Sequence, residues 1–299
     1  AMYTSYNVVN RSYTQVSEKA KISRSSRDLV SMLMRDIRMA GFRYYAGPDQ
    51  IAKFAEDSTE GIDGCPDPGI MLPKTSYLKI EDSNDPEKHH NPLVIRKNTQ
   101  GGGTVTTGGA NDTCCDQIQI SYEDFNQNDF GMGEQVYKRY RITYFAEPSP
   151  TSPDSFAVYK IVEYYNQPRV SCDLYEIPPD IGWIRTCPQC TKDAVLVRDH
   201  IEDMEFIPID QNGRVIKDIS GNYPAPEKTG IRDRLYDIRG VDIKLTFRSK
   251  EYFFNDTSSG ANQKVLTGLS ERDITSNDRY LRDSVIVTVG TRNIGGQAF

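Results

Sequence analysis

The chain of 299 residues carries a formal net charge of −6, with 26% charged and 37% hydrophobic residues and 18 tyrosines. This composition excludes a disordered chain, and no apolar run approaches the roughly 18 residues that a membrane span needs, so the sequence as it stands is that of a globular protein. Residues 11 to 43 hold eight Lys and Arg against three Asp and Glu, a net of +5, so the remainder carries −11.

The chain opens on Ala1 followed by Met2. An alanine before a methionine is more easily explained as a remnant of cloning than as a natural start, so we assign residues 1–2 to such a remnant. We therefore expect that part of the natural chain upstream of Tyr3 is missing.

Residues 3–45 are expected to form one long N-terminal helix. Between Val9 and Gly41 the sequence has no proline or glycine, which permits about 30 helical residues over roughly 45 Å. Gly41 is the predicted stop.

The two halves of this helix differ in their apolar pattern. The first half has a narrow stripe with spacings of four, three and four, as in a helix that packs on other helices: Val9, Tyr13, Val16 and Ala20. The second half has a wider apolar face, which we expect to be buried against the sheet of the same chain: Leu29, Leu33, Ile37 and Ala40. The alternative is an ordinary surface helix with a solvated basic face.

Downstream, residues 46–116 are rich in Gly, Pro, Asp, Asn and Thr, which predicts mostly loop with short strands near 70–80 and 92–97. Alternating or β-branched stretches follow, and each predicts a strand: 116–122, 135–145, 156–165, 194–209, 241–249 and 283–292. The predicted fold class is α+β, with the helix laid on an antiparallel sheet. Residues 46–299 form the globular β domain, and 46–195 its variable, loop-rich region.

Six cysteines are the candidates for disulfide bonds: Cys65, Cys114, Cys115, Cys172, Cys187 and Cys190. An even number of cysteines in a loop-rich chain suits an oxidising compartment. The "TCPQC" stretch could be a local disulfide, half of a zinc site or a redox motif. A strand-like sequence follows where a redox motif needs a helix, and zinc would have only the adjacent Cys114 and Cys115 as a second pair. We favour a disulfide between Cys187 and Cys190.

The sequence offers no catalytic constellation that we recognise, so we expect no enzyme activity and no cofactor. The three histidines lack the serine, cysteine or carboxylate neighbours of a catalytic triad. "DQNG" at 210–213 resembles part of a calcium loop, but the first ligand position would fall on Pro208 and the twelfth on Ile219. A hairpin turn is the favoured interpretation, with a Ca²⁺ site as the alternative.

The stretch "RDLVSMLMRDIRMAGFRYY" (27–45) is similar to the end of the N-terminal helix in minor pilins of the type IV pilus, especially the PilW-like family. The matching positions run from Arg35 through Phe42. Three later stretches resemble the family in their order: 201–215, 238–251 and 279–294. The resemblance covers about a third of the chain. The PilW-like family is also related to the minor pseudopilins of type II secretion.

This resemblance implies a pilin-like fold and a non-enzymatic role in priming or capping a pilus. It implies an absent N-terminal membrane helix, a start in the inner membrane with the domain in the periplasm, and then the extracellular pilus tip of a Gram-negative bacterium. The implied partners are other minor pilins, the major pilin and a possible surface receptor reached through the variable loops. DNA is an unlikely partner, because a net charge of −6 disfavours attraction to phosphates. The alternatives are a minor pseudopilin and a periplasmic binding or thiol-redox domain that uses Cys187 and Cys190.

Overall fold

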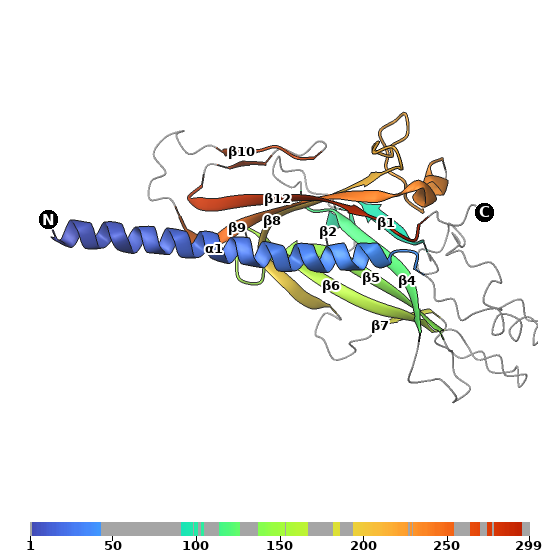
Figure 1. Ribbon diagram of the computed structural model, residues 1–299, viewed down its shortest axis with the longest axis horizontal. Coiled ribbons are helices and arrows are strands. Elements are labelled where there is room, and N and C mark those ends of the chain that lie inside the picture. The colour runs from blue at the N-terminus through green and yellow to red at the C-terminus, as the bar shows by residue number, and fades with distance from the viewer. Residues whose placement is uncertain are drawn as a thin grey trace, which may run out of the picture.

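The computed structural model describes residues 2–42, 91–97, 99–100, 103–104, 114–125, 137–152, 154–166, 182–185, 194–226, 228, 230–253, 264–269, 274–276 and 278–294. One long helix, α1 (Met2–Met39), leads into an antiparallel sheet (Figure 1). The helix begins at Met2, one residue before the predicted segment 3–45, and ends at Met39, before the predicted end of that segment. Among the described residues, no helix combines the length and the apolar character that a membrane crossing requires.

The main sheet has eight strands in the order β1-β4-β5-β6-β8-β9-β12, with β7 paired to β6. Their bounds are β1 Leu93–Arg96, β4 Gln117–Phe125, β5 Tyr137–Pro148, β6 Phe156–Asn166, β7 Gly182–Arg185, β8 Val195–Ile209, β9 Gly240–Tyr252 and β12 Tyr280–Gly290. Two small two-stranded pairs accompany it, β2 Thr99–Gln100 with β3 Gly103–Thr104 and β10 Lys264–Leu266 with β11 Ile274–Ser276.

The six stretches predicted as strands after residue 115 all contain strands, namely β4, β5, β6, β8, β9 and β12. The short strand expected near 92–97 is β1, whereas the one expected near 70–80 lies outside the described residues. The sequence pattern did not predict β7 or the β10–β11 pair, because strands of three or four residues are too short to show a period.

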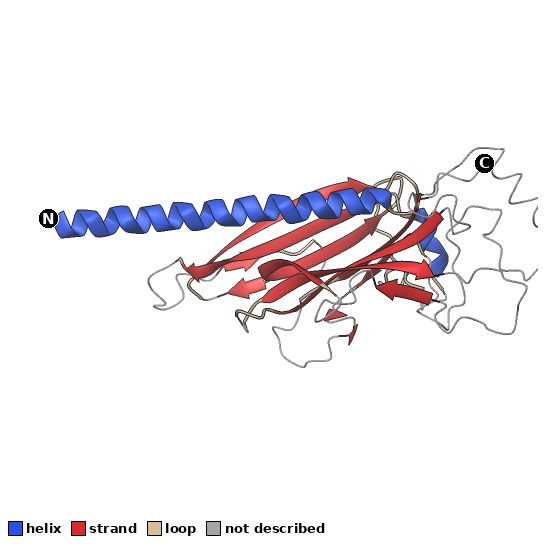
Figure 2. Cartoon of the chain, turned by 90° about the horizontal axis from the view of Figure 1, so that it is seen from below, coloured by secondary structure: helices blue, strands red, loops and turns tan. Residues whose placement is uncertain are grey.

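The sheet curves along the C-terminal half of α1, while the N-terminal half extends beyond the end of the sheet (Figure 2). Alternation along each strand turns one face to the helix, and on β9 this face carries Val241, Ile243, Leu245 and Phe247, all buried. These side chains belong to the same core cluster as Leu29, Leu33, Ile37 and Ala40 of the helix.

The opposite face of the sheet carries buried charged residues. Glu205 and Lys244 are neighbours across β8 and β9, and both are almost fully buried. Segment 267–269, next to β10, covers them: Glu205 accepts a hydrogen bond from the Leu269 N–H at 2.7 Å, and the Lys244 ammonium donates to the Thr267 carbonyl. The two small strands are thereby attached to the outer face of the sheet.

The helix ends as Gly41 predicts. Gly41 has φ +72, and its N–H donates to the Ser121 carbonyl on β4 at 2.8 Å. A Cβ at this position would lie 3.1 Å from the Asn293 carbonyl oxygen, so glycine also permits the close approach of the C-terminal segment. The helix end is therefore fixed to both a central strand and the segment after β12.

Candidate functional site

Where α1 projects from the sheet, its surface carries a line of exposed apolar side chains. Val9, Tyr13 and Val16 are 65%, 77% and 69% exposed, and Ala20 is also exposed. Tyr6, at 64% exposed, extends the same line by one step, so the spacings become three, four, three and four. We call Tyr6, Val9, Tyr13, Val16 and Ala20 the helix stripe. Sequence reasoning missed Tyr6 because the apolar stripe was counted only from Val9, although the predicted helix includes Tyr6.

The second half of α1 carries the residues expected to contact the sheet. Leu29, Leu33, Ile37 and Ala40 are each at most 1% exposed and belong to the main core cluster. Ile22 is the first buried hydrophobic residue among the described parts of the helix. The change from exposed to buried apolar residues thus falls close to Ala20, where the helix reaches the sheet.

A buried carboxylate joins the helix to the sheet. Asp36, whose side chain is 5% exposed, accepts hydrogen bonds from the Tyr144 hydroxyl on β5 and from the Lys160 ammonium on β6, both at 2.6 Å. Arg35 Nε donates to the other carboxylate oxygen at 3.0 Å. We call Asp36, Tyr144, Lys160 and Arg35 the Asp36 cluster. Its bonds fix both the rotation and the axial position of α1 on the sheet.

The Asp36 cluster shifts the titration of its neighbours. Burial, followed by the Asp36 charge and hydrogen bond, raises the pKa of Tyr144. Burial and the same charge raise the pKa of Tyr122, on the adjacent strand β4, to about 12. The hydrogen bond to Asp36 raises the pKa of Arg35. Both tyrosines therefore remain neutral hydrogen-bonding groups across the physiological pH range.

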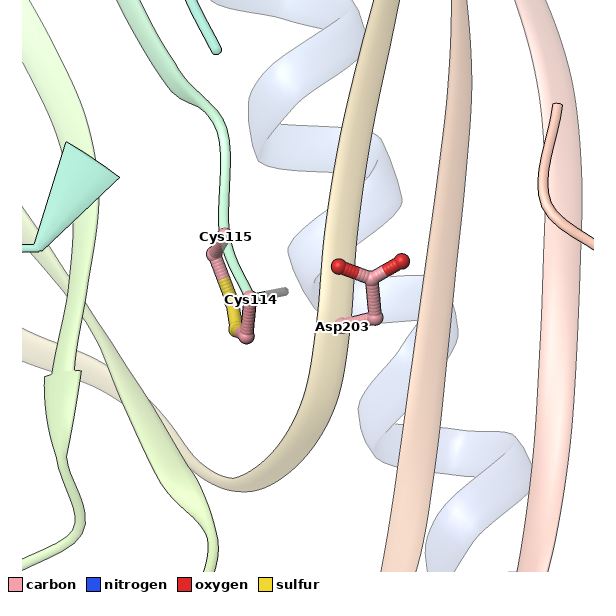
Figure 3. Close-up of side chains that lie close together, drawn as sticks. All are labelled: Cys114, Cys115 and Asp203. Atoms are coloured by element: carbon pink, nitrogen blue, oxygen red, sulfur yellow. A yellow bond between two sulfur atoms is a disulfide. The ribbon is translucent and has the colours of Figure 1, made fainter. Parts of the chain in front are cut away.

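Two adjacent cysteines lie against β8 at the start of β4. Cys114 and Cys115 are joined by a disulfide and buried in the core, and Asp203 on β8 lies beside them (Figure 3). One potential ligand atom from each residue falls within 4.8 Å of the others. Metal binding needs free thiolates, and the disulfide engages both sulfurs. In this oxidised form Cys114 and Cys115 belong to the main core cluster, and the three residues do not constitute a metal centre.

Cys65, Cys172, Cys187 and Cys190 lie outside the described residues, and so does the favoured pairing of Cys187 with Cys190. The pairing of Cys114 with Cys115 was not predicted. Both residues were disulfide candidates, but as a pair they were considered only as zinc ligands, because nothing in their spacing distinguishes a bond to each other from bonds to distant partners.

Asp116, the residue after this disulfide, hydrogen-bonds to the edge of β8 that no strand covers in the described structure. β6 pairs with β8 only as far as Ile201, and beyond that point the Asp116 N–H donates to the Met204 carbonyl at 2.7 Å. The Asp116 carboxylate accepts the Phe206 N–H at 2.9 Å, while Lys97 Nζ donates to the Phe206 carbonyl at 2.8 Å and to Asp116 at 2.5 Å. The backbone N–H and the carboxylate of Asp116, together with the Lys97 ammonium, thus take the place of the backbone partners that a neighbouring strand would supply.

The "DQNG" segment forms a hairpin turn. Ile209 and Val215 are bridged, Gly213 has φ +73, and one Asp210 carboxylate oxygen accepts the N–H groups of Asn212 and Arg214 at 2.8 and 2.9 Å. These bonds, that of Arg214 foremost, lower the pKa of Asp210. The same arrangement recurs eight residues later around Asp218. The hairpin interpretation of this sequence is confirmed.

The one described histidine lies at an irregularity of β8. His200 has φ +60, and its Nε2 is 3.4 Å from the Thr151 hydroxyl. That hydroxyl donates to Asp199 at 2.6 Å instead. Burial lowers the pKa of His200. At Asp199 burial acts to raise the pKa, but the hydrogen bonds from Ser149, Thr151 and the His200 N–H, together with the His200 charge, lower it. Because the Thr151 hydroxyl directs its proton to Asp199 and not to His200, these residues fix a β-bulge in place and do not form a nucleophile with its base.

Comparisons with known proteins identify few relatives. No protein-family model matches the sequence, and no curated protein matches it. Among solved structures, the chain is similar to a type IV-like pilin from Thermus thermophilus, with a TM-score of 0.40 and 11% sequence identity over 91% of this chain and 96% of that one. At this TM-score and identity we draw no functional conclusion from the likeness.

Proposed function

We propose that this protein is a minor pilin of the PilW-like type, a non-enzymatic subunit that primes assembly of a type IV pilus or caps its tip without a cofactor. The observation that carries the proposal is the helix stripe, a regularly spaced apolar line on a helix that extends beyond its own sheet. Spacings of three and four residues are those of a seam between packed helices. Regular exposed apolar surface of this kind marks an interaction site.

The size of the stripe favours an assembly over a simple pair. Fully burying one large apolar side chain contributes about 1.5–3 kcal/mol, so its four large residues could contribute about 6–12 kcal/mol. Association itself costs about 4–15 kcal/mol in lost freedom of motion. A single partner that covers part of the stripe would therefore bind weakly. A filament in which several helices surround this one covers the stripe from more than one side.

The Asp36 cluster supports the same role. A subunit whose projecting helix packs among its neighbours must transmit force from that helix to its domain. The buried bonds from Asp36 to Tyr144 and Lys160 attach the helix to two strands, and the Gly41 turn attaches its end to β4. The wider resemblance at 27–45 and in the three later stretches adds independent support from the sequence.

In this proposal the domain occupies the periplasm while the subunit is held at the inner membrane, and the cell exterior once the pilus of a Gram-negative bacterium has assembled. A buried disulfide suits both locations. The partners are other minor pilins and the major pilin, and the variable region 46–195 offers the surface for any receptor.

The test is to introduce Val9→Asp with Val16→Asp into the chromosomal gene of the host and to count surface pili by electron microscopy. We expect near-complete loss of pili with normal amounts of folded protein. The matched control is Ile286→Asp, which also places a carboxylate at an exposed apolar position, at 59% exposure on β12. Normal piliation of the stripe variant would refute the proposal. Intact pili with lost secretion of exported enzymes would instead identify a minor pseudopilin.

A further inference from the structure

The outward face of α1 changes from apolar to basic where the helix reaches the sheet. Four exposed arginines follow the helix stripe along the domain half: Arg24, Arg27, Arg35 and Arg38. We call them the arginine ridge. At 1.5 Å per residue they extend over roughly 21 Å.

The ridge and the stripe occupy the same face. With about 100° of rotation per residue, the stripe from Tyr6 to Ala20 and the ridge from Arg24 to Arg38 fall within one sector of roughly 100°. The buried residues Leu29, Leu33 and Ile37 point to the opposite side. A partner helix that follows the stripe toward the domain therefore meets the arginines without leaving the seam.

Few described acidic groups balance the ridge. Asp28 is exposed at its edge, and Asp36 on the sheet side is bonded to Arg35. Glu18 is bonded to Lys21, one turn before the ridge. The ridge thus retains a net positive charge, in contrast to the −11 carried by the chain outside residues 11–43.

We propose that the arginine ridge selects the neighbouring subunit, and that the surface it receives is an acidic helix of a different pilin, with Asp or Glu at the positions that face the arginines. The inference rests on the proposed function, since it concerns the same helix face. The stripe supplies apolar contact that many helices could make, whereas opposite charges across an interface set the choice and the register of the partner.

Charge complementarity disfavours the other occupants. A second copy aligned in parallel and in register would place arginines against arginines, and like charges across an interface are repulsive. A nucleic acid would match the ridge but not the apolar stripe that continues it, and the chain as a whole is negative. An acidic helix matches both halves of the face, the helix stripe and the arginine ridge.

The experiment replaces Ser31, which is exposed in the middle of the ridge, with the photo-crosslinking residue benzoylphenylalanine. The codon is introduced into the chromosomal gene of the host. The crosslinked peptide is identified by mass spectrometry. We expect a helix from a different pilin subunit with at least two carboxylates near the crosslinked position. Arg24→Glu with Arg27→Glu should reduce the yield at least about fivefold, whereas Arg24→Lys with Arg27→Lys should keep most of it.

A matched control reverses two exposed charges elsewhere, Arg214→Glu with Lys228→Glu, and should leave the crosslink unchanged. The inference is overturned by a crosslink to a second copy of this chain, to nucleic acid or to a peptide without acidic residues. It is also overturned if no crosslink forms, or if charge reversal on the ridge has no effect. Pilus counts in the Val9 and Val16 variant test the proposed function separately, so failure of one idea is distinguishable from failure of the other.

Discussion

Replacement of Asp36 by alanine is expected to destabilise the fold by about 3 kcal/mol. Removal of one partner from a buried ion pair typically costs about 3–5 kcal/mol, because the other charge remains buried and unpaired. Here the value falls at the lower end, because the Lys160 side chain is 13% exposed and its ammonium can reach water. The Tyr144 hydroxyl, buried between helix and sheet, also loses its acceptor.

A double-mutant cycle that combines Asp36→Ala with Lys160→Met isolates the coupling between Asp36 and Lys160. This second change leaves Asp36 with Tyr144 and Arg35, and it should cost about 1–2 kcal/mol. With both changes together no charge is stranded, so the total should be smaller than the sum by about 2 kcal/mol. That difference measures the coupling between helix and sheet through the cluster.

The assay is urea unfolding followed by far-ultraviolet circular dichroism and by the fluorescence of the single tryptophan, Trp183 on β7. Since one core cluster joins the helix to most of the sheet, both probes should shift together. An Asp36→Ala variant within about 1 kcal/mol of the parent, or a coupling below about 0.5 kcal/mol, would contradict the reasoning.

Three further predictions concern the stability of the fold. Leu33→Ala should cost about 2–5 kcal/mol in urea unfolding, because Leu33 is fully buried. Gly41→Ala and Gly213→Ala should each lose about 1–2 kcal/mol from left-handed strain at φ +72 and +73. Only the first adds a 3.1 Å contact with backbone, so its melting temperature should fall further. Tyr122, with a folded pKa of about 12, stays protonated where the unfolded chain ionises near pH 10. Stability should therefore hold below pH 10 and decline toward pH 12, and less steeply in Tyr122→Phe.

Local patterns predicted the elements well, and long-range contacts explain what was missed. The helix, its end at Gly41 and seven strands follow from spacing and from the absence of proline and glycine. Asp36 stood in a recognised motif, yet its role depends on Tyr144 and Lys160, more than a hundred residues away, which no local pattern connects.

The bond between Cys114 and Cys115 was missed for a different reason. With six cysteines, composition permits many pairings, and only the placement of the chain against β8 selects one. The arginine ridge was visible in the sequence as a basic helix. Its alignment with the stripe became apparent once burial showed which face α1 turns to the sheet.

The occupied edge of β8 has a consequence for how copies of this chain can associate. An uncovered strand edge is a template on which a strand from another molecule can be added, and it favours aggregation at high local concentration. Along Met204 to Phe206 the positions that an incoming strand would need are already occupied by Asp116 and the Lys97 ammonium. In the proposed filament, crowded subunits would thus be kept from exchanging strands at this edge, and association would be left to the surface of the helix.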